Sequence, residues 1–127
     1  MMKTIFTENA PKAIGPYSQG VKVGNLLFLS GQIPIDPATG NVVENDINLQ
    51  TQQVMKNIQA ILESEELTLN HIVKSTIFVK DMSQFATINE EYGKALGDHR
   101  PARSTVEISR LPKDVLIEIE VIASTEK

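Results

Sequence analysis

Three ionisable side chains near the C-terminus stand where strands are expected. Residues 115–123 alternate between apolar and other side chains, as in a strand with one buried face, and the second set of positions carries Glu118 and Glu120. Residues 102–108 alternate in the same way and carry Arg103. If the two segments pair as a hairpin, the three charged side chains share one face of the sheet, whatever the register. Such a group makes either a solvated surface or a binding site.

The residue types suit the recognition of a small organic acid. The guanidinium of Arg103 can bind a carboxylate through two parallel hydrogen bonds, and it stays charged when poorly hydrated. Two neighbouring carboxylates raise each other's proton affinity, and a partly desolvated glutamate can serve as a general acid or base near neutral pH. The alternatives are a structural ion pair between Arg103 and Glu118 or Glu120, and two exposed glutamates on a strand.

Two segments nearer the N-terminus could also contact a ligand. Gly15-Pro16 is a turn-forming pair that would hold Tyr17 in a loop, where its hydroxyl could bond a substrate or its ring could simply pack. Ser30 and Gly31 end an expected strand, and glycine allows the backbone to approach a ligand closely. The Ser30 hydroxyl and the Gly31 amide could therefore orient a carboxylate or a water molecule.

Hydrophobic periodicity and turn residues predict six strands and two helices. The first helix is expected from Asp46 or Asn48, either of which can cap it, with an apolar stripe formed by Val54, Ile58, Ile61 and Leu62. The second is expected from Ser83 to about Leu96, with Phe85, Ile88, Tyr92 and Leu96 near one face. Strands are predicted at 4–7, 20–23, 26–30, 72–80, 102–108 and 115–123, with a turn at 24–25 and a loop at 36–41.

This order of elements predicts an α+β fold in a single domain, residues 1–127, with a six-stranded, mixed and mostly antiparallel sheet. Two helices cannot cover both faces of such a sheet, so we expect them together on one face. The other face would carry Arg103 and Glu118 beside Leu116, Ile122 and either Leu26/Phe28 or Leu27/Leu29. Because these neighbours are too apolar for a freely solvated surface, we expect oligomerisation through this face.

Composition narrows the classes of function. The chain contains no cysteine, which excludes disulfides and thiol chemistry. His71 and His99 are its only histidines and form no ligand-spaced cluster, so we predict no metal site and expect both to be solvated. The net charge of −4 argues against nucleic-acid binding. No apolar run is long enough to span a membrane or to form the core of a signal peptide, so we predict a cytoplasmic protein.

Four segments together resemble the Rid family of imine and enamine deaminases, the YjgF-type proteins once grouped as L-PSP endoribonucleases. The segments are GPYSQG at 15–20, LSGQIP at 29–34, IVKSTIFVKD at 72–81 and PARSTVEISRLPKDVLIEIE at 101–120. The resemblance implies a homotrimer of chorismate-mutase-like α+β subunits, with sheets facing inward and active sites in the clefts between subunits. It also implies a catalytic Glu118 and a structural Glu120, a choice that spacing alone does not make.

The resemblance further implies an activity: hydrolysis of reactive 2-imino or enamine acids, such as 2-aminoacrylate and 2-iminobutyrate, to the 2-keto acid and ammonia. Arg103 would hold the substrate carboxylate, Glu118 would supply or accept a proton, and no cofactor is implied. The residues given substrate or pocket roles are Tyr17, Ser30, Gly31, Phe85, Asn89, Arg103 and Thr105. Two alternatives remain: a regulatory module that binds a small 2-keto acid without turnover, and an endoribonuclease.

Three positions depart from the family pattern. Thr105 stands where many members have cysteine, which excludes a cysteine-dependent mechanism but not hydrolysis through Glu118 and water. Arg100 stands where phenylalanine is common, in a loop before Pro101 that is shorter than in many relatives, and this affects the predicted substrate preference. Glu66 stands where glycine often ends the helix, so a left-handed backbone there would cost about 1 kcal/mol unless the helix ends differently.

Overall fold

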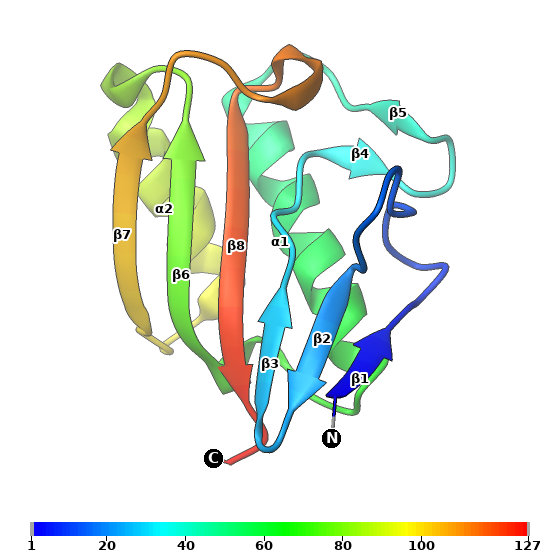
Figure 1. The fold of residues 1–127 in the computed structure, drawn as a ribbon. Helices are drawn as coiled ribbons and strands as arrows, with labels where there is room; N and C mark the ends of the chain where they lie inside the picture. The colour runs from blue at the N-terminus through cyan, green and yellow to red at the C-terminus, as the bar shows by residue number, and fades with distance from the viewer. Residues whose placement is uncertain (1, 127) are drawn as a thin grey trace.

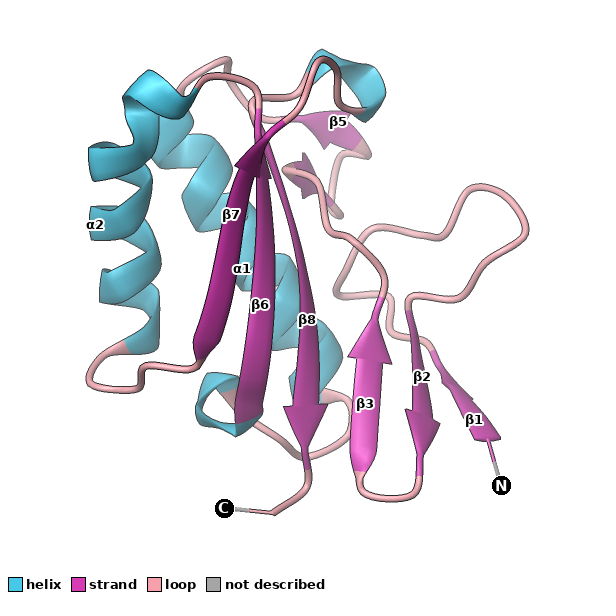
Figure 2. Cartoon of the chain, turned by 60° about the vertical axis from the view of Figure 1, so that its left-hand side comes forward, coloured by secondary structure: helices cyan, strands magenta, loops and turns pink. Residues whose placement is uncertain are grey.

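The computed structural model describes residues 2–126, which form one large sheet with both helices on a single face (Figures 1 and 2). In spatial order the strands are β1 (Met2–Ile5), β2 (Gly20–Val23), β3 (Leu26–Leu29), β8 (Ile117–Ser124), β6 (Ile72–Val79) and β7 (Ala102–Glu107). The helices are α1 (Ile47–Glu63) and α2 (Phe85–Leu96). The predicted α+β class, the six-stranded sheet and the placement of both helices are confirmed.

Apolar stripes join the helices to the sheet. On α1 the four predicted residues are completely buried: Val54, Ile58, Ile61 and Leu62. On β8 the predicted apolar face is buried as well: Ile117, Ile119, Val121 and Ala123. The cap is Asp46, which accepts a hydrogen bond from the Leu49 amide at 3.0 Å. Neither α1 nor α2 combines the length and the hydropathy that crossing a membrane requires.

The end of α1 and the loop after β3 add local detail to the prediction. Glu66 adopts a left-handed backbone, with φ 61°, at a cost of about 1 kcal/mol. The Leu67 amide then donates to the Leu62 carbonyl at 3.0 Å, and the largely buried Leu67 side chain helps to offset that cost. The loop predicted at 36–41 is flanked by a small ribbon that the sequence did not predict, β4 (Ile35–Asp36) paired with β5 (Asn41–Val42).

The predicted C-terminal hairpin is wrong, because β6 lies between β7 and β8 (Figure 1). β6 pairs antiparallel with β8 and parallel with β7. A parallel neighbour requires a crossover connection, and α2 provides it between β6 and β7. The chain after β7 then passes over the end of the sheet and enters β8 on the far side of β6. Proximity in sequence suggested a hairpin, but the crossover helix determines the pairing.

This strand order also reverses the predicted orientation of β7. Ser75 on β6 lies opposite both Arg103 and Val121, so Arg103 shares the face that packs on the helices. Phe78 lies opposite both Val106 and Glu118, so these three residues share the open face. We call the two sides of the sheet the helix face and the open face. Arg103 and Glu118 are therefore on opposite faces, contrary to the prediction from a hairpin.

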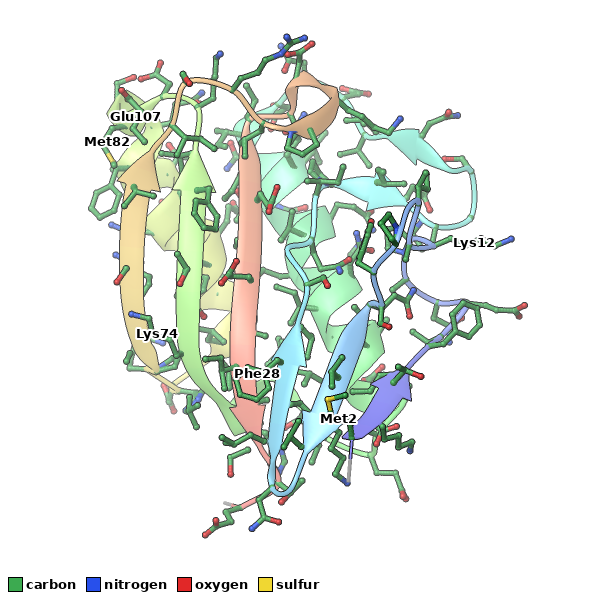
Figure 3. All side chains as sticks on the ribbon, viewed as in Figure 1. Met2, Lys12, Phe28, Lys74, Met82 and Glu107 are labelled. Atoms are coloured by element: carbon green, nitrogen blue, oxygen red, sulfur yellow. The ribbon has the colours of Figure 1, made fainter. Side chains whose placement is uncertain are left out.

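The second helix begins with a short 3-10 turn, η2 (Met82–Gln84), at the predicted start. Asp81 accepts a hydrogen bond from the Ser83 amide at 2.9 Å, and the predicted face of α2 is buried at Ile88, Tyr92 and Leu96. Glu107, at the end of β7, accepts from the Met82 amide at 2.7 Å, and Figure 3 shows these two residues side by side. This contact attaches the start of α2 to the end of the strand that carries Arg103.

A buried carboxylate joins the two helices. Glu91 on α2 accepts hydrogen bonds from Asn48 and Gln52 of α1, both at 2.9 Å. These amide donors, Asn48 first, lower the pKa of the Glu91 carboxyl. The contact fixes the rotation of α2 about its axis, and this rotation determines which side chains α2 presents to β7.

Buried amides on α1 position the two segments that border Glu118. The Asn57 side chain is 1% exposed and donates to the carbonyls of Ile33 and Ile35 at 3.2 and 3.0 Å. Gln50 is equally buried, and its Oε1 accepts from the Leu116 amide at 2.8 Å. Since backbone groups in such surroundings need partners, these two side chains hold the chain just after Gly31 and just before Glu118.

We predict that Asn57→Ala lowers the free energy of unfolding by about 1–3 kcal/mol, because two backbone carbonyls lose their donor. The measurement is urea unfolding followed by circular dichroism. Gln59→Ala is the matched control, since Gln59 is an exposed α1 residue bonded to Glu63. Equal losses for the two variants would contradict the role given to Asn57.

Candidate active site

Arg103 is held by α2 rather than by a carboxylate. Its Nη1 donates to Oδ1 of Asn89 at 2.7 Å, and its Cζ lies 5.3 Å from the ring centre of Phe85 and 5.5 Å from that of Tyr92. Both distances are in the range of cation–π contacts. The ion pairs found in residues 2–126 do not involve Arg103, so the structural ion pair considered from sequence is absent there. The guanidinium is oriented and retains donors for an anion.

Thr105 lies on the same face of β7, two residues further along. Its Oγ1 is buried and has no hydrogen-bond partner within the described residues. A buried hydroxyl without a partner is unusual, because it loses its hydrogen bonds to water and gains none in return. A small polar ligand next to Arg103 could supply the missing partner. We refer to Arg103, Thr105, Phe85, Asn89 and Tyr92 as the arginine cluster.

Glu118 is half-buried on the open face. Burial, and secondarily the negative charge of Glu120, raises the pKa of the Glu118 carboxyl above its ordinary value. Glu120 is exposed two residues along the same face. A partly desolvated carboxyl of this kind is suited to acid/base chemistry.

A bulge brings the backbone at Gly31 against Glu118. Phe28 pairs with Ile122, but the next bridge joins Gln32 to Ile119, so the first strand has one extra residue between the two pairs. A Cβ at position 31 would overlap the Glu118 carboxylate, so any residue other than glycine would displace the Glu118 side chain from this position. Within residues 2–126 the Gly31 amide donates to no acceptor. The Gly31 backbone therefore offers a hydrogen-bond donor to a ligand that binds next to Glu118.

Tyr17 lies with Gly31 in a hollow of about 260 Å³, whose wall also includes Lys113. Its side chain is 53% exposed, and its hydroxyl accepts a long hydrogen bond of 3.4 Å from the Ile14 amide. The hydroxyl is therefore free to donate to a ligand. We refer to Tyr17, Ser30, Gly31 and Glu118 as the glutamate cluster.

Ser30 forms hydrogen bonds to the protein backbone, in addition to the ligand contact predicted for it. Its Oγ donates to the Ser18 carbonyl at 2.6 Å and its amide donates to the Gln19 carbonyl at 2.9 Å. Both contacts tie the end of β3 to the loop that carries Tyr17. Only the lone pairs of the hydroxyl remain for a ligand.

The predicted site residues thus fall into two groups that one chain does not bring together. The arginine cluster occupies the helix face at the β7 edge, while Glu118 occupies the open face two strands away. Sequence reasoning missed the contact of Tyr92 with Arg103, although the helical spacing of Phe85, Asn89 and Tyr92 places all three on one side of α2. It also missed Lys113, which reaches the hollow from the η3 turn (Pro112–Asp114).

The two histidines have structural partners rather than free rings. His71 accepts a hydrogen bond from the Thr68 amide at 3.1 Å, in a capping box that starts the η1 turn (Leu69–His71). His99 is half-buried, with Nε2 at 2.7 Å from the Ile72 carbonyl, so the prediction that it is simply solvated is wrong. The structure gives neither ring a place in the arginine or glutamate cluster.

Comparison with known proteins gives consistent matches over nearly the whole chain. A family model described as Endoribonuclease L-PSP matches residues 7–125. A RutC family protein of Pyrococcus horikoshii is 60% identical, covering 99% of this chain and 100% of the relative. The 2-iminobutanoate/2-iminopropanoate deaminase of Salmonella typhimurium is 55% identical, covering 97% and 98%. The crystal structure of a putative endoribonuclease from Thermotoga maritima superposes with a TM-score of 0.96 at 51% identity, covering 100% of both chains.

We predict that Glu118 titrates above its ordinary value of 4.5 when its carboxyl carbon is followed by NMR against pH. Glu120→Gln removes the smaller cause, so it should lower the Glu118 pKa while leaving it raised by burial. A Glu118 carboxyl that titrates at or below 4.5 would contradict the desolvated environment described here.

Proposed function

The chain belongs to the L-PSP/YjgF family, also called Rid, and we propose that it hydrolyses reactive 2-imino and enamine acids to the 2-keto acid and ammonia. The observation that carries this proposal is the half-buried Glu118, with a raised pKa, against the backbone of Gly31. Such a carboxyl keeps its proton to a higher pH than usual and is therefore suited to acid/base work. The deaminase name of relatives about 55% identical supports the same reaction.

The two clusters would complete one another across a subunit interface. The open face of the sheet exposes large apolar side chains, among them Val23, Leu26, Phe28 and Val106. Phe28 is visible on this face in Figure 3, which views the sheet from its open side. Single chains rarely leave such a face in water, and a closed symmetric oligomer buries it without leaving a free edge. We therefore retain the predicted homotrimer, with the arginine cluster of one subunit facing the glutamate cluster of the next.

In this composite site each residue has a definite chemical task. Arg103 would bind the substrate carboxylate with the donors that Asn89 leaves free. Protonated Glu118 would donate to the imine nitrogen, and the resulting carboxylate would accept a proton from the attacking water. The carbinolamine would then release ammonia and leave the 2-keto acid. The Gly31 amide and the Thr105 and Tyr17 hydroxyls would orient the water or the carboxylate, and modest positioning suffices for such a reactive bond.

The endoribonuclease reading is weaker. Both histidines have structural hydrogen bonds, and the net charge is −4, so neither the usual acid/base pair nor a basic surface for RNA is supplied. A pure keto-acid sensor would have no need of a carboxyl with a raised pKa at position 118. A cytoplasmic location stays a prediction.

A coupled assay tests the proposed activity. A threonine dehydratase with threonine generates 2-iminobutyrate, and release of 2-ketobutyrate is followed with and without this protein. We expect release above the spontaneous rate. The assay is repeated with serine, which generates 2-aminoacrylate, and absence of acceleration with both would refute the enzyme proposal.

We predict that Arg103→Lys loses most of the activity, although the charge is kept. An ammonium group cannot reproduce two parallel hydrogen bonds to a carboxylate, and it does not stack on Phe85 as a planar guanidinium does. The measurement is kcat/KM in the coupled assay. Near-parental activity would mean that Arg103 is only a structural cation.

We predict that two inactive variants restore activity when they assemble together. Glu118→Gln should slow turnover by roughly 10²–10⁴-fold and Arg103→Lys should also be nearly inactive. In a random mixed trimer, roughly a quarter of the sites between subunits would pair an intact Arg103 with an intact Glu118. The measurement is the activity of the co-expressed, doubly tagged protein.

The control is the same co-expression with two differently tagged Arg103→Lys chains, which should stay inactive. Light scattering on the parent protein should give the mass of a trimer at micromolar concentration. The composite site would be overturned by a stable monomer, or by mixed assemblies that are no more active than the controls. The activity itself is tested separately by the coupled assay.

A further inference from the structure

A second guanidinium shares a hollow with Arg103. The hollow has a volume of about 340 Å³ and lies where the end of α2 meets the start of β7. Its lining residues are Asn89, Tyr92, Gly93, Arg100, Pro101 and Arg103. The lining includes two cations and no carboxylate, so the hollow has a positive charge that its own wall does not balance.

Backbone carbonyls hold Arg100 in place. Its Nη1 donates to the Gly97 carbonyl at 2.7 Å and to the His99 carbonyl at 2.8 Å. The loop that supplies these carbonyls is itself anchored, because His99 Nε2 bonds the Ile72 carbonyl at the start of β6. Since both bonds use Nη1, the Nε and Nη2 donors of Arg100 remain for another partner. The guanidinium is positioned in advance, without a carboxylate to neutralise it in residues 2–126.

Arg100 and Arg103 lie along the same side of α2, one turn apart. A Cβ added at Gly93 would be 3.9 Å from Nη2 of Arg100, so this guanidinium lies close to the helix at that glycine. Asn89, which binds Arg103, is four residues earlier and therefore on the same side of the helix. The ring of Tyr92 lies under Arg103, and burial raises the pKa of its hydroxyl while the charges of Arg103 and Arg100 act in the opposite direction.

A substrate with one carboxylate would use only one of these cations. If Arg103 binds the 2-carboxylate, Arg100 lines the same hollow, and its Nε and Nη2 donors are available to a second anionic group bound there. A charged group there would gain charge-assisted hydrogen bonds, whereas an alkyl side chain would gain none. The pair of guanidiniums therefore fits a small molecule with an anionic group at each end.

We propose that Arg100 binds a distal carboxylate and that the protein acts preferentially on 2-imino dicarboxylates of four or five carbons. This inference rests on the proposed imine hydrolysis and specifies its substrate class. Arg103 and Glu118 perform the same tasks as before, and Arg100 determines which substrates are bound well. Arg100 takes no part in the proton transfers.

The first test compares two substrates in three proteins. 2-Iminoglutarate is generated by a glutamate oxidase and 2-iminobutyrate by a threonine dehydratase, and kcat/KM for hydrolysis is measured for the parent, Arg100→Gln and Lys56→Gln. Lys56 is an exposed lysine on α1, so its variant controls for the loss of one positive charge. We expect Arg100→Gln to lower kcat/KM for 2-iminoglutarate by about 10- to 100-fold, since a hydrogen bond to a charged group is lost, and to change 2-iminobutyrate hydrolysis by less than about threefold.

The second test measures binding without turnover. The parent and both variants are titrated with 2-oxoglutarate and with 2-ketobutyrate by calorimetry. We expect tighter binding of 2-oxoglutarate to the parent, and loss of this preference in Arg100→Gln alone. If the protein hydrolyses imines but neither test shows a preference for the dicarboxylate that depends on Arg100, this inference is overturned. The proposed function then stands. Selective 2-oxoglutarate binding without any hydrolysis would refute the deaminase activity while supporting the role of Arg100.

Discussion

The position of β6 between β7 and β8 determines where every candidate catalytic group lies. Because β6 pairs parallel with one neighbour and antiparallel with the other, its own residues fix the orientation of both. Pairing with Ser75 places Arg103 on the helix face, and pairing with Phe78 places Glu118 on the open face. A shift of either pairing by one residue would move one of the two groups through the sheet, so the central strand sets the chemistry of both faces.

The separation of the clusters has an electrostatic benefit for the single chain. A guanidinium next to Glu118 would favour the charged carboxylate, whereas burial beside Glu120 favours the protonated form. The acid and the carboxylate anchor are thus prepared in different surroundings and would meet only across an interface. Binding of an anionic substrate would then place a negative charge between them and weaken the influence of Arg103 on the acid.

Local signals in the sequence were sufficient for the six strands of the large sheet and the two α-helices, but not for the pairing of the strands. The periodicity of Val54, Ile58, Ile61 and Leu62 and the capping by Asp46 depend on neighbours within a few residues, and both predictions hold. The partner of β7 depends instead on a crossover through α2, which no local pattern records. The alternation in β7 was also ambiguous, because an edge strand is only partly covered on either face: Val106, on the predicted buried side, is 41% exposed. The types of the site residues and the face of Glu118 were predictable, but the face of Arg103 was not.

The bulge between Phe28 and Gln32 constrains the length of this segment as well as its composition. Removal of one residue would let β3 continue in register with β8 without a bulge. The Gly31 backbone would then no longer lie against Glu118. Insertion of a residue would instead carry Tyr17 and its loop away, because that loop is tied to Ser30. Loops elsewhere in such a fold can gain or lose residues with little effect. Here the residue count itself is part of the active-site geometry, and an alignment that opens a gap between 28 and 32 would describe a different site.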